Sequence, residues 1–210
     1  MRMNDGLRDR ILDAASDIVI NDGAAAASTR AIAHNAGIDP AEVEEVYANH
    51  EHLLMDLLNR EYDGVRRIVA DNIERDPMGG LLSRIYHYSL GAAHERPLTR
   101  ALYLQDRESL SQIIRATHDT EFFPRIGADR PFLARLQEVG MIRADVDVDD
   151  LGAFLSAYMA GAAITAPNTD INSTTAALVL LLERGVDADV TDTEPGKRAM
   201  YELLGRHETR

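Results

Sequence analysis

The chain has 210 residues, a net charge of −13, 45% hydrophobic residues and 27% charged residues. This composition is typical of a folded protein of one or two domains and excludes a wholly disordered chain. The absence of cysteine excludes disulfides, thiolate metal sites and cysteine nucleophiles. The excess of acidic residues argues against nucleic acid as a partner, because lysine and arginine drive binding to phosphates.

The hydrophobic pattern predicts a protein without membrane segments. Residues 1–10 are polar and charged, so we expect no signal peptide. The longest apolar run covers residues 151–166, which is shorter than the roughly 20 residues that a membrane span needs. We therefore expect a cytoplasmic protein with no membrane partner.

Apolar residues recur at helical spacing along the whole chain, and alternating, strand-like runs are nearly absent. Glycine, proline or aspartate marks each junction between the periodic segments. The pattern therefore predicts an all-α fold of about nine to ten helices. The expected helices cover residues 7–21, 28–36, 39–47, 49–75, 81–94, 97–118, 129–140, 148–166, 171–185 and 195–206.

The second and third of these helices outline a helix-turn-helix. Gly37 can take the positive φ of a tight turn between them. Asp39, Pro40 and Glu42 form an N-terminal signature, with aspartate as the cap, proline at the first helical position and glutamate reaching back to the cap. In a helix-turn-helix the second helix of the pair enters the major groove of DNA, although generic two-helix hairpins have the same spacing.

Several motifs follow one another in order near the N-terminus. They are Arg8–Ala15, Gly23, Ser28–Ala33, Ala36–Ile38, Tyr47 and Glu51–Leu53. Together they resemble the N-terminal domain of the tetracycline-repressor (TetR) family of transcriptional regulators. Later in the chain, Gly140–Asp147 and Leu151–Leu155 are similar to the family's entry into its dimer-forming helices.

The resemblance implies a dimeric, ligand-responsive transcriptional regulator, most often a repressor that its effector releases from operator DNA. It implies a helix-turn-helix DNA-binding domain at residues 1–48 and an effector-binding and dimerisation domain at residues 49–210, in which residues 49–75 form the connecting helix. It also implies a set of DNA-contacting residues: Arg8, Ser28, Thr29, Arg30, Pro40, Ala41, Glu42, Glu45, Tyr47 and His50.

The sequence departs from the family in its charge. The helix expected to read DNA carries Glu42, Glu44 and Glu45, and residues 1–56 hold four basic and eleven acidic side chains, a net charge of −7. A glutamate can accept a hydrogen bond from the N4 amino group of cytosine, and Arg30 with helix-end amides can hold phosphates. The alternative is a ligand-sensing or partner-binding protein of the same fold that has lost DNA binding.

The C-terminal domain is expected to hold a small, largely apolar effector and to form a homodimer. Candidate pocket residues, each of which can also be core, are Tyr86, Ser89, Tyr103, Phe122, Phe123, Phe154 and Tyr158. A stripe of small residues with an adjacent ridge predicts the dimer interface, unless both pack inside one protomer. These residues are Gly152, Leu155, Ser156, Met159, Ala160, Ala163, Leu178, Leu181 and Leu182.

No catalytic or metal-binding motif is present. The pairs His50/His52 and His87/His94 lack the spacing of a zinc site. The segment Asp145–Asp150 begins like a calcium loop but lacks the required glycine and the terminal glutamate, so we expect Asp147 to be a helix cap instead. We therefore expect no enzyme activity, no cofactor and no metal.

Overall fold

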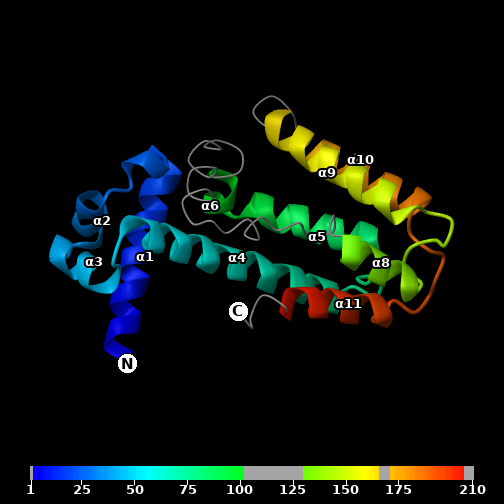
Figure 1. The fold of residues 1–210 in the computed structure, drawn as a ribbon, viewed down its shortest axis with the longest axis horizontal. Coiled ribbons are helices and arrows are strands. Elements are labelled where there is room, and N and C mark those ends of the chain that lie inside the picture. Colours follow the sequence, from blue (N-terminus) through cyan, green and yellow to red (C-terminus); the bar gives the residue numbers. More distant parts are fainter. Residues whose placement is uncertain (1, 102–129, 166–170, 206–210) are drawn as a thin grey trace. The chain divides into compact units, whose positions relative to one another are not determined.

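The computed structural model describes residues 2–101, 130–165 and 171–205, and the regular elements in these ranges are all helical (Figure 1). A single β-bridge, between Ile142 and Asp187, is the nearest approach to a strand in them. The all-α prediction is confirmed. The elements are α1 (Arg2–Asp22), the 3-10 turn η1 (Ala24–Ala26), α2 (Thr29–Ala36), α3 (Pro40–Val46), α4 (His50–Arg75), α5 (Leu82–Glu95), α6 (Pro97–Arg100), α8 (Arg130–Glu138), α9 (Val148–Thr165), α10 (Ile171–Gly185) and α11 (Glu194–Gly205).

The predicted helices agree with these bounds to within a few residues, with two differences. Helix α1 begins at Arg2, five residues before the first apolar position that the periodicity detects, because its first turn is polar. The predicted helix 97–118 begins as α6, and its remainder after Ala101 lies outside the described residues. Within the described ranges no helix is both long and apolar enough to cross a membrane.

The chain divides into two compact units by its internal contacts. The first unit comprises residues 1–64 and 96–123, and the second comprises residues 65–95 and 124–210. Helix α4 therefore belongs to both. The boundary expected after residue 48 divides DNA-binding residues from effector-binding residues, whereas the two compact units are defined by packing. The expected boundary stays a prediction.

The core of the first unit joins α1, α2, α3 and the first half of α4. Its centre contains Ile11, Ala15, Ile32 and Leu53, each at most 1% exposed. Leu98 of α6 packs into the same core. The apolar positions at helical spacing thus point inward, and the polar faces of the short helices are exposed.

The core of the second unit joins the rest of α4 to α5, α8, α9, α10 and α11. Helix α10 packs along α5, and α8 contacts both α9 and α11 (Figure 1). Lys197, the single lysine of the chain, is buried, and its Nζ donates to the carbonyl oxygen of Glu74 at 3.2 Å. The hydroxyl of Tyr201 donates to the Glu74 carboxylate at 2.5 Å. These contacts fasten α11 to the end of α4.

The start of α11 approaches the loop before α5 so closely that only glycine fits. A Cβ atom on Gly80 would lie 2.0 Å from the carbonyl oxygen of Thr193, and one on Gly196 would lie 2.1 Å from the carbonyl oxygen of Gly80. The hydroxyl of Thr193 donates to the carbonyl oxygen of Pro77 at 2.7 Å, which holds the two segments together.

We predict that Gly80→Ala lowers the free energy of unfolding by about 2 kcal/mol or more, because the added methyl displaces backbone and not a flexible side chain. Gly91→Ala is the matched control, since a Cβ at this position in α5 meets no atom within 4 Å. It is expected to stabilise by up to about 1 kcal/mol through helix propensity. Urea unfolding of both variants measures the difference, and equal stabilities would refute the close contact.

Candidate functional site

The helix-turn-helix predicted from the sequence is present in the first unit. Ser28 caps α2, its hydroxyl accepting from the N–H of Ala31 at 3.3 Å, and Gly37 ends the helix at φ 65°. Asp39 caps α3 by accepting from the N–H of Ala41, and Glu42 accepts from the N–H of Asp39, both at 2.9 Å. The expected capping box with Pro40 at the first helical position is confirmed.

Helix α3 turns its acidic residues outward. Val43 is buried at 2% exposure, whereas Ala41, Glu44 and Glu45 are exposed. The side chains of Glu44 and Glu45 make no hydrogen bond or ion pair with any residue that the structure describes. Glu42 is half-buried, and its carboxylate accepts from the N–H of Asp39 in the capping box. The outer face of the candidate reading helix therefore carries two unneutralised carboxylates.

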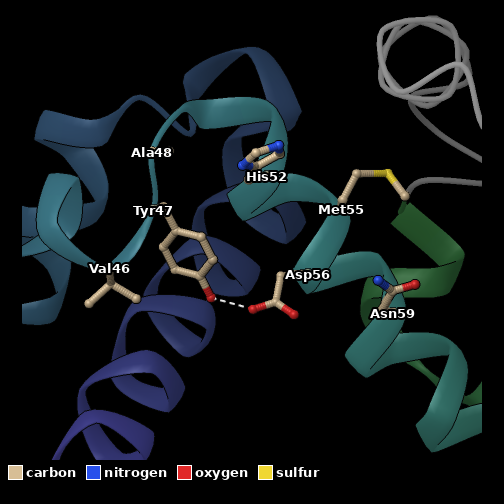
Figure 2. Close-up of a pocket in the computed structure, with 7 residues that line it drawn as sticks. All are labelled: Val46, Tyr47, Ala48, His52, Met55, Asp56 and Asn59. Atoms are coloured by element: carbon tan, nitrogen blue, oxygen red, sulfur yellow. Dashed lines mark hydrogen bonds between the residues drawn. The ribbon is translucent and has the colours of Figure 1, made fainter. Parts of the chain in front are cut away.

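Arg8 and Tyr47, both predicted to contact DNA, meet at a carboxylate that the sequence reasoning did not identify. The Nε of Arg8 donates to Oδ2 of Asp56 at 2.6 Å, and its Nη2 donates to Oδ1. The hydroxyl of Tyr47 donates to Oδ2 at 2.5 Å (Figure 2). The ring of Tyr47 is buried in the core of the first unit, and its role as a DNA contact stays a prediction. Nothing local predicts this partner, because Arg8 and Asp56 lie 48 residues apart.

The cluster fixes the ionisation of its members. Burial raises the pKa of Asp56, but the hydrogen bonds from Arg8 and Tyr47 outweigh burial and leave the pKa below its usual value. Burial and the bond to Asp56 raise the pKa of Tyr47, and the bond to Asp56 raises the pKa of Arg8. At neutral pH the cluster is thus an ionised carboxylate between a guanidinium and a protonated phenol.

The other cations of the helix-turn-helix face differ in their availability. A guanidinium nitrogen of Arg10 donates to the carbonyl oxygen of Ala36 at 2.8 Å, and Arg60 pairs with Asp13 at 2.7 Å. Arg30 is exposed, and its side chain has no partner among the described residues. Thr29 is half-buried beside it. Partial burial lowers the pKa of His50, although the nearby Glu51 raises it, so this ring is mostly uncharged at neutral pH.

A cavity of about 330 Å³ opens beside Tyr47 and Asp56. It lies between the segment that follows α3 and one face of α4, and His52, Met55 and Asn59 line its α4 side (Figure 2). Open space therefore adjoins the Asp56 cluster on one side.

A second carboxylate joins α4 to α6 within the first unit. Glu61 accepts from Arg96 at 2.5 Å, from the hydroxyl of Thr99 at 2.7 Å and from the N–H of Thr99 at 3.1 Å. It therefore satisfies a free N–H at the start of α6. Burial raises the pKa of Glu61, but the bonds from Arg96 and Thr99 prevail and lower it.

We predict that Glu61→Gln lowers the free energy of unfolding by about 1–3 kcal/mol at neutral pH, because it removes the ionised acceptor. A carboxyl whose folded pKa is depressed stabilises above its unfolded pKa, about 4.3, and loses that contribution as the pH falls through the folded pKa. The deficit of Glu61→Gln should therefore shrink on going from about pH 7 to about pH 3, as urea unfolding at both values measures. Glu44→Gln, on an exposed carboxylate, should stay within about 0.5 kcal/mol at either pH.

The predicted effector residues fall into three groups. Tyr86 and Ser89 of α5 are buried in the second unit, and their hydroxyl oxygens have no hydrogen-bond partner among the described residues. Burial raises the pKa of Tyr86 well above its usual value. Tyr158 is half-buried against the same core. Phe154 is 51% exposed on α9, and its role as a pocket residue stays a prediction. The remaining candidates, Tyr103, Phe122 and Phe123, lie outside the described residues.

The predicted dimer residues separate into an inner and an outer set. Leu155, Leu178 and Leu182 are buried in the core of the second unit, and Gly152 is buried as well, so these four are not available to a partner. The pattern of small residues and leucines did not distinguish inward from outward positions. The side chains of Ala160 and Ala163 are not described. Of the predicted residues, Ser156, Met159 and Leu181 are exposed. Phe154 and Leu180, which were not predicted for the interface, are exposed on the same two helices, and these five residues are called the outer set.

The described residues contain no group of three or more potential metal ligands. Asp147 caps α9 as expected, since its Oδ1 accepts from the N–H of Asp149 at 2.9 Å and of Asp150 at 3.1 Å. The segment that begins like a calcium loop is thus a helix start.

The sequence matches no known family model and no curated protein. Solved structures do match, and many are TetR-family transcription regulators. A TetR-family regulator from Marinobacter aquaeolei is 21% identical, with a TM-score of 0.59 over 90% of this chain and 100% of that one. A γ-butyrolactone receptor is 19% identical, with a TM-score of 0.59 over 98% and 100%. A ketosteroid transcriptional regulator of Mycobacterium tuberculosis is 18% identical, with a TM-score of 0.57 over 87% and 95%.

Proposed function

We propose that this chain, which has the fold of the TetR-family transcription regulators, is a ligand-responsive transcriptional regulator that acts as a repressor. In this proposal the protein is cytoplasmic and forms a homodimer. The observation that carries the proposal is the helix-turn-helix of the first unit. Two short capped helices meet at the left-handed Gly37, and α4 follows directly and continues into the second unit. This arrangement supports DNA reading by α3 and transmission of ligand binding along α4.

In this proposal the DNA contacts come from helix starts and one free cation. Ser28 and Thr29 bring the N-terminus of α2 to the phosphates, and Arg30 supplies the charge. Pro40 and Ala41 stand at the start of α3, and Glu45 is the base-reading side chain, accepting from a cytosine N4 amino group.

The second candidate function is partner binding without DNA. It is favoured by the exposed carboxylates of Glu44 and Glu45, which repel a polyanion, and by the internal engagement of Arg8 and Arg10. Like charges across an interface cost several kcal/mol.

The test is selection of fragments from a genomic library at low salt, followed by affinity measurement on the selected fragment. Glu44→Gln should tighten binding about two- to tenfold, since it removes a repulsive charge and no base contact. Glu45→Gln should weaken preference for its cytosine position, with a loss of about 1–3 kcal/mol of discrimination. Retention of no fragment by the wild-type chain would refute DNA binding and support the partner-binding alternative.

We also propose that the second unit holds the effector at α5. The buried hydroxyls of Tyr86 and Ser89 stand three residues apart on one face of this helix and are free to bond a polar group of a largely apolar molecule. Two neighbours of the same fold are named for small organic ligands, a γ-butyrolactone and a ketosteroid.

The homodimer is expected to form through the outer set on α9 and α10. Leu181 is 62% exposed, which is unfavourable for a large apolar side chain unless a partner covers it. We predict that Leu181→Arg shifts the chain from dimer to monomer in sedimentation velocity, because it places a charge in the apolar interface. Ala144→Arg, an exposed position outside α9 and α10, is the matched control and should leave the dimer intact. A Leu181→Arg dimer of wild-type affinity would exclude this face.

A further inference from the structure

We infer that Asp56 is a lock that withholds Arg8 from the DNA backbone, so that the DNA affinity of the first unit depends on whether α4 keeps this carboxylate in place. The inference deepens the proposed function and rests on it. It assigns a role in DNA binding to a residue that makes no DNA contact itself.

The lock joins three segments through one side chain. Asp56 lies on α4, Arg8 on α1, and Tyr47 directly follows α3. The Asp56 carboxylate accepts three hydrogen bonds, two from the guanidinium of Arg8 and one from Tyr47. A bidentate guanidinium–carboxylate pair is among the strongest contacts that side chains make, because both bonds are charge-assisted and planar.

The pairing of Arg8 with Asp56 lowers the positive charge available on the surface that is proposed to face DNA. The Arg8 side chain is 52% exposed, so it is within reach of a phosphate, whereas that of Asp56 is 18% exposed. Residues 1–56 carry four arginines, and Arg10 is engaged with the carbonyl oxygen of Ala36. Among the arginines of this range whose side chains the structure describes, release of Arg8 would therefore add a second cation without a hydrogen-bond partner beside Arg30. One further phosphate contact makes the slope of log affinity against log salt concentration steeper by about 0.9.

The position of Asp56 allows the lock to open. Helix α4 carries Asp56 in the first unit and continues to Arg75 in the second unit, where α11 holds its end. A displacement of α4 that moves Asp56 away from α1 breaks the pair. A cavity adjoins Asp56 and Tyr47 (Figure 2), so the Asp56 carboxylate has open space on one side.

A double-mutant cycle on DNA affinity tests the lock. Wild type, Arg8→Ala, Asp56→Asn and the double variant, all as full-length chains, are titrated with random-sequence duplex DNA from about 50 to about 200 mM salt. Glu51→Gln is the matched control, because it changes the net charge equally and lies at an exposed position on the same helix. Thermal unfolding of each variant shows whether it is folded.

The lock predicts a strong dependence of the Arg8 effect on Asp56. Arg8→Ala alone should leave the salt slope unchanged, since Arg8 makes no phosphate contact in the wild-type chain. It should weaken binding by no more than about twofold, through the Asp56 carboxylate that it leaves without its guanidinium partner. Asp56→Asn should bind about five- to tenfold tighter with a slope steeper by about 0.9, and adding Arg8→Ala should remove that gain. Glu51→Gln should tighten binding less and leave the slope near that of wild type. A merely structural role for Asp56 would lower stability without steepening the slope.

Each other result refutes the lock. If Arg8→Ala alone weakens binding and flattens the slope by about 0.9, Arg8 already contacts phosphate in the wild-type chain. This arm decides the matter even if Asp56→Asn fails to fold. Equal gains in Asp56→Asn and Glu51→Gln would reduce the effect to net charge. If no variant binds DNA, including Glu44→Gln, the proposed function falls and the lock falls with it, whereas DNA binding without the coupling overturns the lock alone.

Discussion

Asp56 holds together three segments that are distant in sequence and adjacent in the first unit. Its carboxylate binds the guanidinium of Arg8 on α1 and the hydroxyl of Tyr47 at the end of α3, while its own helix is α4. The burial that disfavours an isolated carboxylate is compensated here, because Arg8 and Tyr47 both donate hydrogen bonds to it. One charged group thus adds polar links between α1, α4 and the residue after α3 to the apolar core that they share.

The helix-turn-helix lies in the more acidic part of the chain. Residues 1–56 have a net charge of −7 and residues 57–210 a net charge of −6, so the acidity is concentrated where DNA is expected. Pairing of Arg8 with Asp56 reduces the available positive charge further, and Arg10 donates to the carbonyl oxygen of Ala36. The exposed carboxylates of Glu44 and Glu45 would repel DNA, whereas helix N-termini and Arg30 would attract its phosphates. Under the proposal that Asp56 withholds Arg8, DNA binding by this surface is weak until Arg8 is released.

In the second unit, polar contacts also hold neighbouring segments together. Lys197 and Tyr201 hold α11 to the last turn of α4, and Gly80 allows the start of α11 to approach within backbone contact distance. The apolar residues left over, Phe154 and Leu181 among them, are exposed on α9 and α10.

The sequence by itself determined the helices, their caps and the class of fold. Gly37, the Asp39–Glu42 capping box and the apolar spacing each act within a few residues, so their structural effect can be read locally. Tertiary structure decided which charges are free and which apolar faces are covered. Neither the pairing of Arg8 with Asp56 nor the burial of Leu155 beside the exposed Phe154 follows from spacing, because both depend on which helix lies opposite. A helical pattern specifies an apolar stripe, whereas only packing specifies the neighbour that buries it.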